Sequence, residues 1–393
     1  MTIMRAISAG HICLDINPDL STVPSGKFGD LLQPGKMVRS GRIDLRAGGA
    51  AANTGLVMDR LGIPVKLIGK IGDDLFGSAL KAWIESQSVH LADDLVVDLA
   101  APTGYSIIVN FPGDERTIIH NPGANDVFYA SDLPRAVLQE ADLFHFGYPT
   151  LMRSVYRGEG GELVSIMQRA RRAGLSTSLD VSLPDSDSNA GLVDWFRILS
   201  NSLPLVDIFT PDAAELAFML EPERYQQLLS NSSEPFLQSV TPEMLHEWTD
   251  ILLGWGVKLV LVKLGERGLY LRTAKVKSWE RAGRGLSELS DLWINRELWA
   301  PAFNVSVEGT TGAGDAATGG FLASLLRGQS PELALVISAG TGGVSVENAE
   351  CSSSVISWEG ILERIKKGWE VQPLDLTAYG WKQIDEFGIW QNA

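Results

Sequence analysis

Short apolar runs alternate with longer segments along most of the chain, and the two kinds of segment differ in periodicity. The short runs have the length and apolar content of buried β-strands. They cover residues 6–12, 65–68, 143–146, 175–179, 206–209 and 258–262. Strands of this kind, separated by segments long enough to form helices, are typical of βαβ units.

The longer segments place apolar residues at helical spacing, and several begin at a Gly, Asp or Pro that suits a helix cap or first turn. They cover residues 50–61, 75–86, 162–173, 212–220 and 316–326. The alternation predicts an α/β fold with a mostly parallel sheet that is covered by helices on both faces.

Two segments depart from this alternation. Residues 36–46 alternate polar and apolar positions around a Ser-Gly pair, and residues 104–120 form a hairpin pattern that reverses at a Pro-Gly-Asp sequence. We predict a small β-sheet lid over one edge of the core, built from residues 14–47 and 101–121. Lids of this kind exclude water during group transfer.

The rest of the chain completes the predicted domain organisation. We expect the α/β core to bind both nucleotide and substrate. The core comprises residues 1–13, 48–100 and 122–371, with polar or irregular insertions at 221–238 and 273–296, and residues 372–393 form a C-terminal tail.

The composition narrows the functional classes. The chain has 393 residues, of which 45% are hydrophobic and 21% charged, and its formal net charge is −15. This charge argues against a generic nucleic-acid binder, since phosphate backbones are bound largely by clustered Lys and Arg, although a local basic groove is compatible with it. An anionic cofactor would have to be held by local devices such as glycine-rich turns at helix N-termini.

The same pattern bears on cellular location. We find no run of about 18 apolar residues that would indicate a membrane span, and the apolar start of the chain is interrupted by Ser8, Gly10 and His11. Cys13 and Cys351 lack the spacing of a metal site or a CxxC motif. We therefore expect a cytoplasmic protein that binds neither membrane nor nucleic acid.

The clearest candidate for chemistry lies at residues 310–320, TTGAGDAATGG. Its small residues allow backbone N–H groups to converge on an anion at the start of a helix, where the helix dipole favours negative charge. Asp315 in this turn would lie beside a phosphate and could accept a proton from an attacking hydroxyl. The alternative is that Asp315 only caps the helix.

Two further parts of the sequence contain candidate residues for binding an acceptor. Gly48 and Gly49 lie at the junction of lid and core, where paired glycines can act as a hinge, and Asn53 offers a donor and an acceptor to a polyol. Close packing of small helical residues is the alternative. Asp15 follows the first strand, where open α/β sheets place their ligands, although it could simply form a turn.

Motifs of several competing enzyme classes are absent from the sequence. Neither Gly69-Lys70 nor Gly35-Lys36 has the upstream glycine of a P-loop, and a single Gly10 stands where a nicotinamide-binding motif would have GxGxxG. The five histidines show no zinc-hydrolase spacing. We interpret His145 as a core or strand-end residue. The histidines are His11, His90, His120, His145 and His246.

These motifs, in this order, resemble those of the ribokinase-like carbohydrate kinases, also called the PfkB family. The resemblance runs from about Ile3 to Lys367, and the glycine-rich turn before Asp315 is its most specific part. It is carried by Asp15, GGAAANTGLVMDRLG (48–62), KIGDDLFG (70–77), GDERTI (113–118), NPGAN (121–125), VDIFTPDAAE (206–215), VKLGERG (262–268) and TTGAGDAATGGF (310–321).

The resemblance implies a Rossmann-like α/β core with a β lid. It also implies phosphoryl transfer from Mg-ATP to a hydroxyl, commonly a primary alcohol, of a sugar or nucleoside. By this resemblance Asp315 would be the general base, with the backbone amides of Gly312, Ala313 and Gly314 as the anion hole. The acceptor would contact Asp15, Gly48, Gly49 and Asn53. The nucleotide would lie near Lys263, Gly265, Gly268, Thr310, Gly340 and Asn348. Glu215 and Asp212 would position magnesium through water.

Three positions differ from the family pattern. Gly309 stands where the family usually has Asp, so a ligand for the monovalent cation that activates many members is missing unless Glu308 replaces it. Asp212 stands in place of a typical Asn, which keeps an oxygen ligand and adds charge near the metal. Asp180-Val181-Ser182 stands where Asp-x-Asn is common, which leaves a polar contact to nucleotide or sugar open.

The acceptor stays open at this stage. A sugar kinase and a nucleoside kinase would share the same chemistry, and Phe28, Tyr105 or Phe111 could provide the platform that a nucleobase needs. A third hypothesis is a catalytically silent sugar-binding or regulatory protein, against which the intact turn before Asp315 argues. Exposed lid strands would also be compatible with a homodimer.

Overall fold

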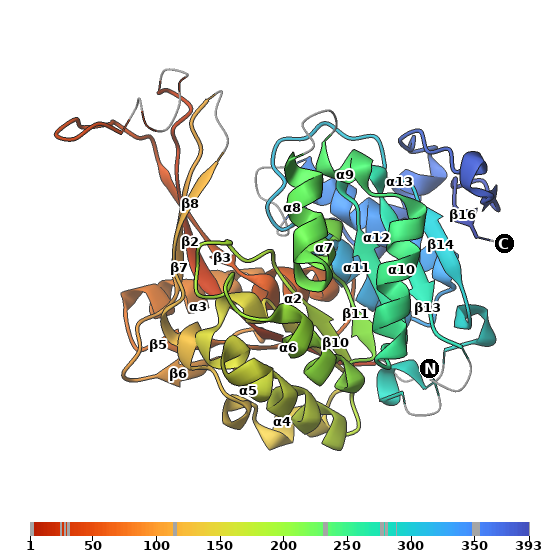
Figure 1. The fold of residues 1–393 in the computed structure, drawn as a ribbon. Helices are drawn as coiled ribbons and strands as arrows, with labels where there is room; N and C mark the ends of the chain where they lie inside the picture. Colours follow the sequence, from red (N-terminus) through yellow and green to blue (C-terminus); the bar gives the residue numbers. More distant parts are fainter. Residues whose placement is uncertain are drawn as a thin grey trace.

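The structure is a computed structural model that describes residues 4–23, 26, 29, 32–112, 116–230, 235–275, 279, 282–287, 289–347 and 354–392. Within these ranges the chain forms a large sheet with helices on both faces, and a smaller four-stranded sheet that projects from one side of this body (Figure 1). The predicted α/β class with a small separate sheet is confirmed.

Six neighbouring strands of the large sheet are parallel. In spatial order they are β4 (Val65–Ile68), β1 (Ala6–Gly10), β9 (Leu143–Gly147), β10 (Ser176–Asp180), β11 (Ile208–Phe209) and β12 (Leu259–Lys263). The sheet continues beyond β12 with antiparallel strands. These are β13 (Leu269–Thr273), β14 (Glu297–Ala300), β16 (Trp390–Gln391) and β15 (Lys382–Gln383).

Alternate residues of the central strands face two separate apolar cores, as the period of a β-strand requires. On β12, Val260 and Val262 belong to one core, whereas Leu259 and Leu261 belong to the other. The first core is covered by α5 (Arg153–Arg172), α6 (Trp195–Ser202), α7 (Ala213–Leu220) and α10 (Pro242–Gly254). The second is covered by α2 (Ala50–Arg60), α11 (Ala313–Leu326), α12 (Pro331–Val346) and α13 (Trp358–Lys366).

The small sheet has the order β3 (Ile43–Gly48), β2 (Cys13–Pro18), β7 (Tyr105–Val109) and β8 (Thr117–Asn121). Its base packs on α3 (Leu75–Gln87), whose buried Leu80 and Ile84 share a core with Leu14 of β2. The strands β5 (Lys70–Gly72) and β6 (Val96–Asp98) precede and follow α3 in the sequence. They pair with each other in a separate two-stranded parallel sheet. The predicted hairpin of residues 104–120 is confirmed as β7 and β8, whose connecting residues 113–115 lie outside the described ranges.

Several sequence-based boundaries were wrong. Of the predicted strand segment 36–46, only residues 43–46 lie in a strand, β3, and among the described residues the pairing with the β2 side extends before it only through hydrogen bonds of Asp19 with Gly41 and Arg42. The helix predicted at 162–173 is confirmed as the longer, C-terminal part of α5; what the sequence did not predict is the short helical segment from Arg153, which non-helical backbone at residues 157–160 separates from it. The segment 221–238, expected to be irregular, contains α8 (Pro222–Ser230) and α9 (Phe236–Ser239).

Candidate active site

The candidate site lies where the parallel strands of the large sheet end. Asp180 and Lys263 are the last residues of β10 and β12, and Tyr148 directly follows β9. Carboxyl ends of parallel strands form the ligand-binding edge of open α/β sheets. α11 begins at the same edge, since its first turn carries Asp315, which interacts electrostatically with Asp180 and Tyr148.

The turn that precedes α11 brings backbone amides to the helix N-terminus. Gly312 is the N-cap residue and has a φ of 74°, a left-handed conformation that glycine adopts without steric cost. The N–H groups of the first helical turn have no partner within the helix, and the helix dipole makes this end positive. The predicted anion hole of Gly312, Ala313 and Gly314 therefore lies in a turn suited to bind a phosphate.

Asp315 is buried in the first turn of α11, with only 1% of its surface exposed. Its Oδ2 accepts a hydrogen bond of 2.8 Å from Nδ2 of Asn53. Its Oδ1 is buried and has no hydrogen-bond partner in the described part of the chain. Burial raises the pKa of Asp315, although Asn53, Lys263 and Tyr148 partly oppose the increase. Asn53 thus holds one carboxylate oxygen in place, and the Tyr148 phenol also interacts with the carboxylate.

Lys263 supplies a positive charge beside the anion turn. Its Nζ lies 2.8 and 3.0 Å from the two carboxylate oxygens of Asp180, and a Cβ atom on Gly314 would lie 3.5 Å from this same Nζ. Burial raises the pKa of Asp180 to about 6, against the opposing charge of Lys263. Lys263 is itself protonated, because the charges of Asp180 and Glu215 outweigh the effect of burial and raise its pKa.

The two predicted magnesium residues cap the start of α7. Oδ1 of Asp212 accepts from the Glu215 amide and Oε2 of Glu215 accepts from the Asp212 amide, each at 2.7 Å. Burial raises the pKa of Glu215 well above its usual value, and the negative charges of Asp212 and Asp180 raise it further. The buried carboxyl groups of Asp180 and Glu215 and the half-buried one of Asp212 surround Lys263 and form an oxygen-rich group, which fits a divalent cation such as Mg²⁺.

Asp15 lies apart from this group, on the small sheet. The strand register places it opposite Arg46 of β3 and Ser106 of β7. Its Oδ1 accepts a hydrogen bond of 3.3 Å from Sγ of Cys13. Burial raises the pKa of Asp15, although hydrogen bonds from Cys13 and Ser106 and the charge of Arg46 oppose this.

The glycine pair allows Asp15 and the start of α2 to approach each other closely. A Cβ at Gly48 would overlap the Asp15 carboxylate, and a Cβ at Gly49 would lie 2.7 Å from Nδ1 of His11. Gly49 also has a φ of 89°, which a residue with a side chain rarely adopts. Asn53 contacts Asp315, and its contact with the acceptor stays a prediction.

The residues predicted to lie near the nucleotide fall into three places. Gly265 and Gly268 flank the turn after β12, both with positive φ, and Thr310 is exposed before α11. Gly340 lies in α12, where a Cβ would be 3.5 Å from the Trp369 ring. Asn348 lies outside the described residues.

A pocket of about 390 Å³ lies beside the end of α12. The Trp369 ring stacks on Phe303 with centroids 4.3 Å apart, and the Arg364 guanidinium lies 3.6 Å from the Trp369 centroid. α12 also borders the anion turn, because a Cβ on Gly342 would lie 3.5 Å from the carbonyl oxygen of Ala313. The pocket is lined by Asn304, Val305, Ser306, Glu347, Arg364, Gly368, Trp369 and Glu370.

Tyr148 is a candidate functional residue that the sequence analysis missed. It has a left-handed backbone with φ of 60° and ψ of 52°, a costly conformation that is found preferentially at functional sites. Burial raises the pKa of its phenol well above the usual value, and the charges of Asp315, Asp180 and Glu215 raise it further. The available signal was its position at the end of a predicted strand; nothing in the sequence indicated the left-handed conformation.

His145 is a core residue, as expected. It is fully buried in β9, and its Nδ1 lies 3.0 Å from Oγ of Ser178 on the neighbouring strand. Among the described residues, none of the helices has both the length and the apolar character that crossing a membrane requires.

Comparisons with known proteins agree with this geometry. The chain is 25% identical over 323 residues to the probable fructokinase-5 of Arabidopsis thaliana, covering 81% of this chain and 82% of that protein. Its fold matches the ribokinase of Arabidopsis thaliana solved with ribose and ATP, with a TM-score of 0.66, 20% identity, and coverage of 93% and 99% of the two chains. It also matches a putative ribokinase II from E. coli solved with ATP and Mg²⁺, with a TM-score of 0.65, 19% identity and the same coverage.

These likenesses confirm the ribokinase-like fold. The family model described as "pfkB family carbohydrate kinase" matches residues 19–358, which is most of the chain. The predicted enzyme class, a carbohydrate kinase, is thereby confirmed, and the chain belongs to the pfkB family of carbohydrate kinases.

Proposed function

We propose that this protein transfers the γ-phosphoryl group of Mg-ATP to a hydroxyl, most simply a primary alcohol, of a sugar or sugar derivative. The observation that carries the proposal is the state of Asp315. Asn53 holds one of its oxygens, while the other is buried beside the N-terminus of α11 with no hydrogen-bond partner among the described residues. A carboxylate placed in this way can accept the hydroxyl proton while the adjacent amides bind the phosphoryl oxygens.

The other residues at this edge of the large sheet would then stabilise the negative charge of the phosphate groups. The amides of Gly312, Ala313 and Gly314 would donate hydrogen bonds to the transferring group, and the Lys263 ammonium, which lies beside Gly314, would add positive charge. Bound Mg²⁺ would neutralise phosphate oxygens, and Asp212 and Glu215 would hold it through water molecules. The solved E. coli relative with ATP and Mg²⁺ supports this pair of cofactors.

The pocket beside α12 is our candidate for the nucleotide base. It is bordered by the Trp369 ring, whose faces are covered by Phe303 and the Arg364 guanidinium, and α12 connects it to the anion turn through Gly342. The adenine of ATP would then lie near Gly340, and the phosphates of ATP would be directed toward Ala313. The contacts of Gly265, Gly268 and Thr310 with the nucleotide remain predictions.

The small sheet would hold the acceptor. Asp15 has a half-buried carboxylate, and the glycines at positions 48 and 49 let this part of the small sheet approach the core closely. We propose that residues 14–47 and 101–121 act as a lid that excludes water from the transfer. Exposed apolar residues on its strands, including Ile43, Ile118 and Ile119, are compatible with a homodimer through the lid.

The proposal is tested by incubating the purified protein with Mg-ATP and a panel of sugars and nucleosides. ADP release identifies the acceptor, and phosphorus NMR locates the phosphorylated hydroxyl. We expect turnover with a sugar, as the similarity to fructokinases suggests. Turnover confined to nucleosides would favour the nucleoside kinase instead. ATP and sugar binding without turnover, in a protein that retains Asp315, would support the silent binding protein and contradict the proposal.

A further inference from the structure

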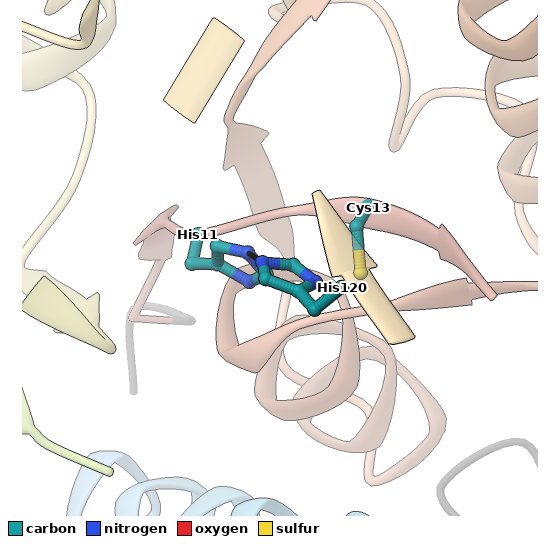
Figure 2. Close-up of side chains that lie close together, drawn as sticks. All are labelled: His11, Cys13 and His120. Carbon is teal, nitrogen blue, oxygen red and sulfur yellow. Dashed lines mark hydrogen bonds between the residues drawn. The ribbon is translucent and has the colours of Figure 1, made fainter. Parts of the chain in front are cut away.

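Three side chains with metal-binding atoms meet where the small sheet joins the core. His11 lies in the connection between β1 and β2, Cys13 begins β2, and His120 lies on β8. Figure 2 shows the two imidazole rings facing each other, with the Cys13 sulfur beside His120. One ligand atom from each residue lies within 4.8 Å of those of the other two.

The two histidines have the separation that one tetrahedral ion would impose. Their Nε2 atoms lie 3.3 Å apart, and two nitrogens bound to the same zinc are separated by about 3.3 Å, because each Zn–N bond is about 2.0–2.1 Å. The same separation is compatible with a hydrogen bond between neutral rings. Burial lowers the pKa of both residues, to about 3 for His11.

The surroundings of His120 favour a ligand role. Its Nδ1 lies 3.1 Å from Oγ of Ser106, which leaves Nε2 directed at His11. Metal-binding histidines typically use their second nitrogen in this way, since the outer hydrogen bond fixes the tautomer and the ring orientation. The hydrogen bonding of His11 is incomplete, because its buried Nδ1 has no partner in the described ranges of the chain.

We propose that His11, Cys13 and His120 bind a zinc ion. Two imidazole nitrogens and one sulfur form a ligand set that zinc prefers and that Mg²⁺ does not, because Mg²⁺ requires oxygen ligands. Cys13 would release its thiol proton to solvent on binding. The fourth position would be taken by water or by the carboxylate of Asp15, whose Oδ1 is 3.3 Å from the Cys13 sulfur.

An ion in this place would act on the small sheet. His11 directly follows the core strand β1, and His120 lies on the small sheet. One ion bound to both would therefore link the core to the small sheet directly beside Asp15. We infer that zinc lowers the affinity for the acceptor by engaging Asp15 or by fixing the sheet. This consequence rests on the proposed function, whereas zinc binding itself does not.

Zinc binding is tested first, with untagged protein and without any kinase assay. Titration calorimetry with ZnCl₂ in excess MgCl₂ should show one zinc per chain. Cys13→Ser and His120→Gln should each weaken binding by at least about tenfold, because loss of even an outer-sphere partner typically costs 10–100-fold. His90→Gln removes an exposed histidine elsewhere and should leave the affinity unchanged.

Cobalt(II) provides a spectroscopic check of the sulfur ligand. The Co²⁺ complexes of wild type and His90→Gln should show a thiolate-to-metal charge-transfer band, and Cys13→Ser should lack it while retaining the far-ultraviolet circular dichroism of the wild type. The proposal is overturned if the wild type binds no zinc, if both ligand variants bind it with wild-type affinity, or if the wild-type cobalt complex shows no such band.

The consequence is tested once an acceptor is known. Zinc should raise the KM for the acceptor several-fold and leave the KM for ATP unchanged, a chelator should reverse the effect, and His120→Gln should lose it. Equal inhibition of wild type and His120→Gln would contradict the regulatory role. If no acceptor is found, the proposed function fails, but the calorimetric and cobalt results still decide the metal site.

Discussion

The edge of the large sheet around Asp315 and the small sheet around Asp15 each hold a hydrogen-bonded carboxylate, but that of Asp315 is buried and that of Asp15 is half-buried. Asp315 lies in a helix that packs against α2 and α12 and is fixed through one oxygen by Asn53. Asp15 lies on a projecting strand and interacts with Cys13 and Ser106 of the same sheet, opposite Arg46 (Figure 1). The first site is anchored in the core, whereas the second belongs to the separate small sheet.

This difference suggests a division of labour. Chemistry requires a base held within a narrow range of positions, which a packed helix terminus provides. Recognition of an acceptor can be placed on a separate sheet, because side chains there can be substituted without displacing the general base. Loss of Asp315 should therefore abolish turnover, while loss of Asp15 should mainly weaken acceptor binding.

The largest effect is expected for Asp315→Asn. Loss of the general base should lower kcat by about 100- to 10,000-fold, with the dissociation constant of ATP little changed. Steady-state kinetics and equilibrium ATP binding measure the two quantities. A kcat within threefold of the wild type would remove Asp315 from the mechanism.

Protein stability gives an independent control for this variant. The folded-state pKa of Asp315 is raised by burial, so its ionisation destabilises the folded protein, increasingly as pH rises from the unfolded-state pKa through the folded-state pKa. Asn removes this charge and can still accept the hydrogen bond from Asn53. The variant should therefore melt at the wild-type temperature or above it at neutral pH. A clearly lower melting temperature would show that any lost turnover reflects misfolding.

The second-largest effect is expected for Asp15→Asn. The amide keeps the size of the side chain but loses the charge and one acceptor, so the KM for the acceptor should rise about 10- to 100-fold, as for a hydrogen bond to a charged group. The kcat should change by less than about fivefold. Asp19→Asn is the matched control, since Asp19 lies just beyond β2 and caps the exposed Ser21 amide. A loss confined to kcat would contradict the division of labour.

The two regions also differ in how far the sequence predicted them. The core edge follows from local rules: a glycine turn before a helix, and polar residues after apolar strands. These rules placed Gly312 and Asp315 in a turn at the start of a helix, where the structure has them, whereas Lys263 was indicated only by the family resemblance. The contact between Asn53 and Asp315 joins residues 262 positions apart, and no local pattern predicts it.

The small sheet depends on strand register, which the sequence pattern left open. A row of polar side chains crosses all four strands through Arg46, Asp15, Ser106 and His120, and it exists only because these strands pair in this register. The hairpin of β7 and β8 was predicted, but its alignment with β2 was not. The cluster of His11, Cys13 and His120 was missed for the same reason.

A smaller effect is expected for Tyr148→Phe. The phenol helps to lower the pKa of Asp315 against the effect of burial, so its removal should raise that pKa. The base would then be protonated at a higher pH, and the acidic limb of the pH–kcat profile should shift upward. At neutral pH, kcat should fall roughly three- to tenfold, as loss of about one hydrogen bond implies. Tyr379→Phe, which alters an exposed tyrosine, is the control. An unchanged pH profile would place Tyr148 outside the network of the base.

The smallest effect is expected for potassium. Gly309 offers no side-chain oxygen, and the carbonyl of Val346 beside it already accepts the amides of Glu308 at 2.8 Å and of Gly309 at 3.3 Å. Exchanging potassium for sodium or tetramethylammonium at constant ionic strength should therefore change kcat by less than about twofold, because a cation site needs several oxygen ligands. Gly309→Asp restores the missing carboxylate and should increase the ratio of the potassium rate to the sodium rate. Strong potassium activation of the wild type would mean that the exposed Glu308 or backbone carbonyls complete a site without residue 309. The core edge would then depend on a bound cation as well as on its own side chains, and its contrast with the small sheet would be less sharp.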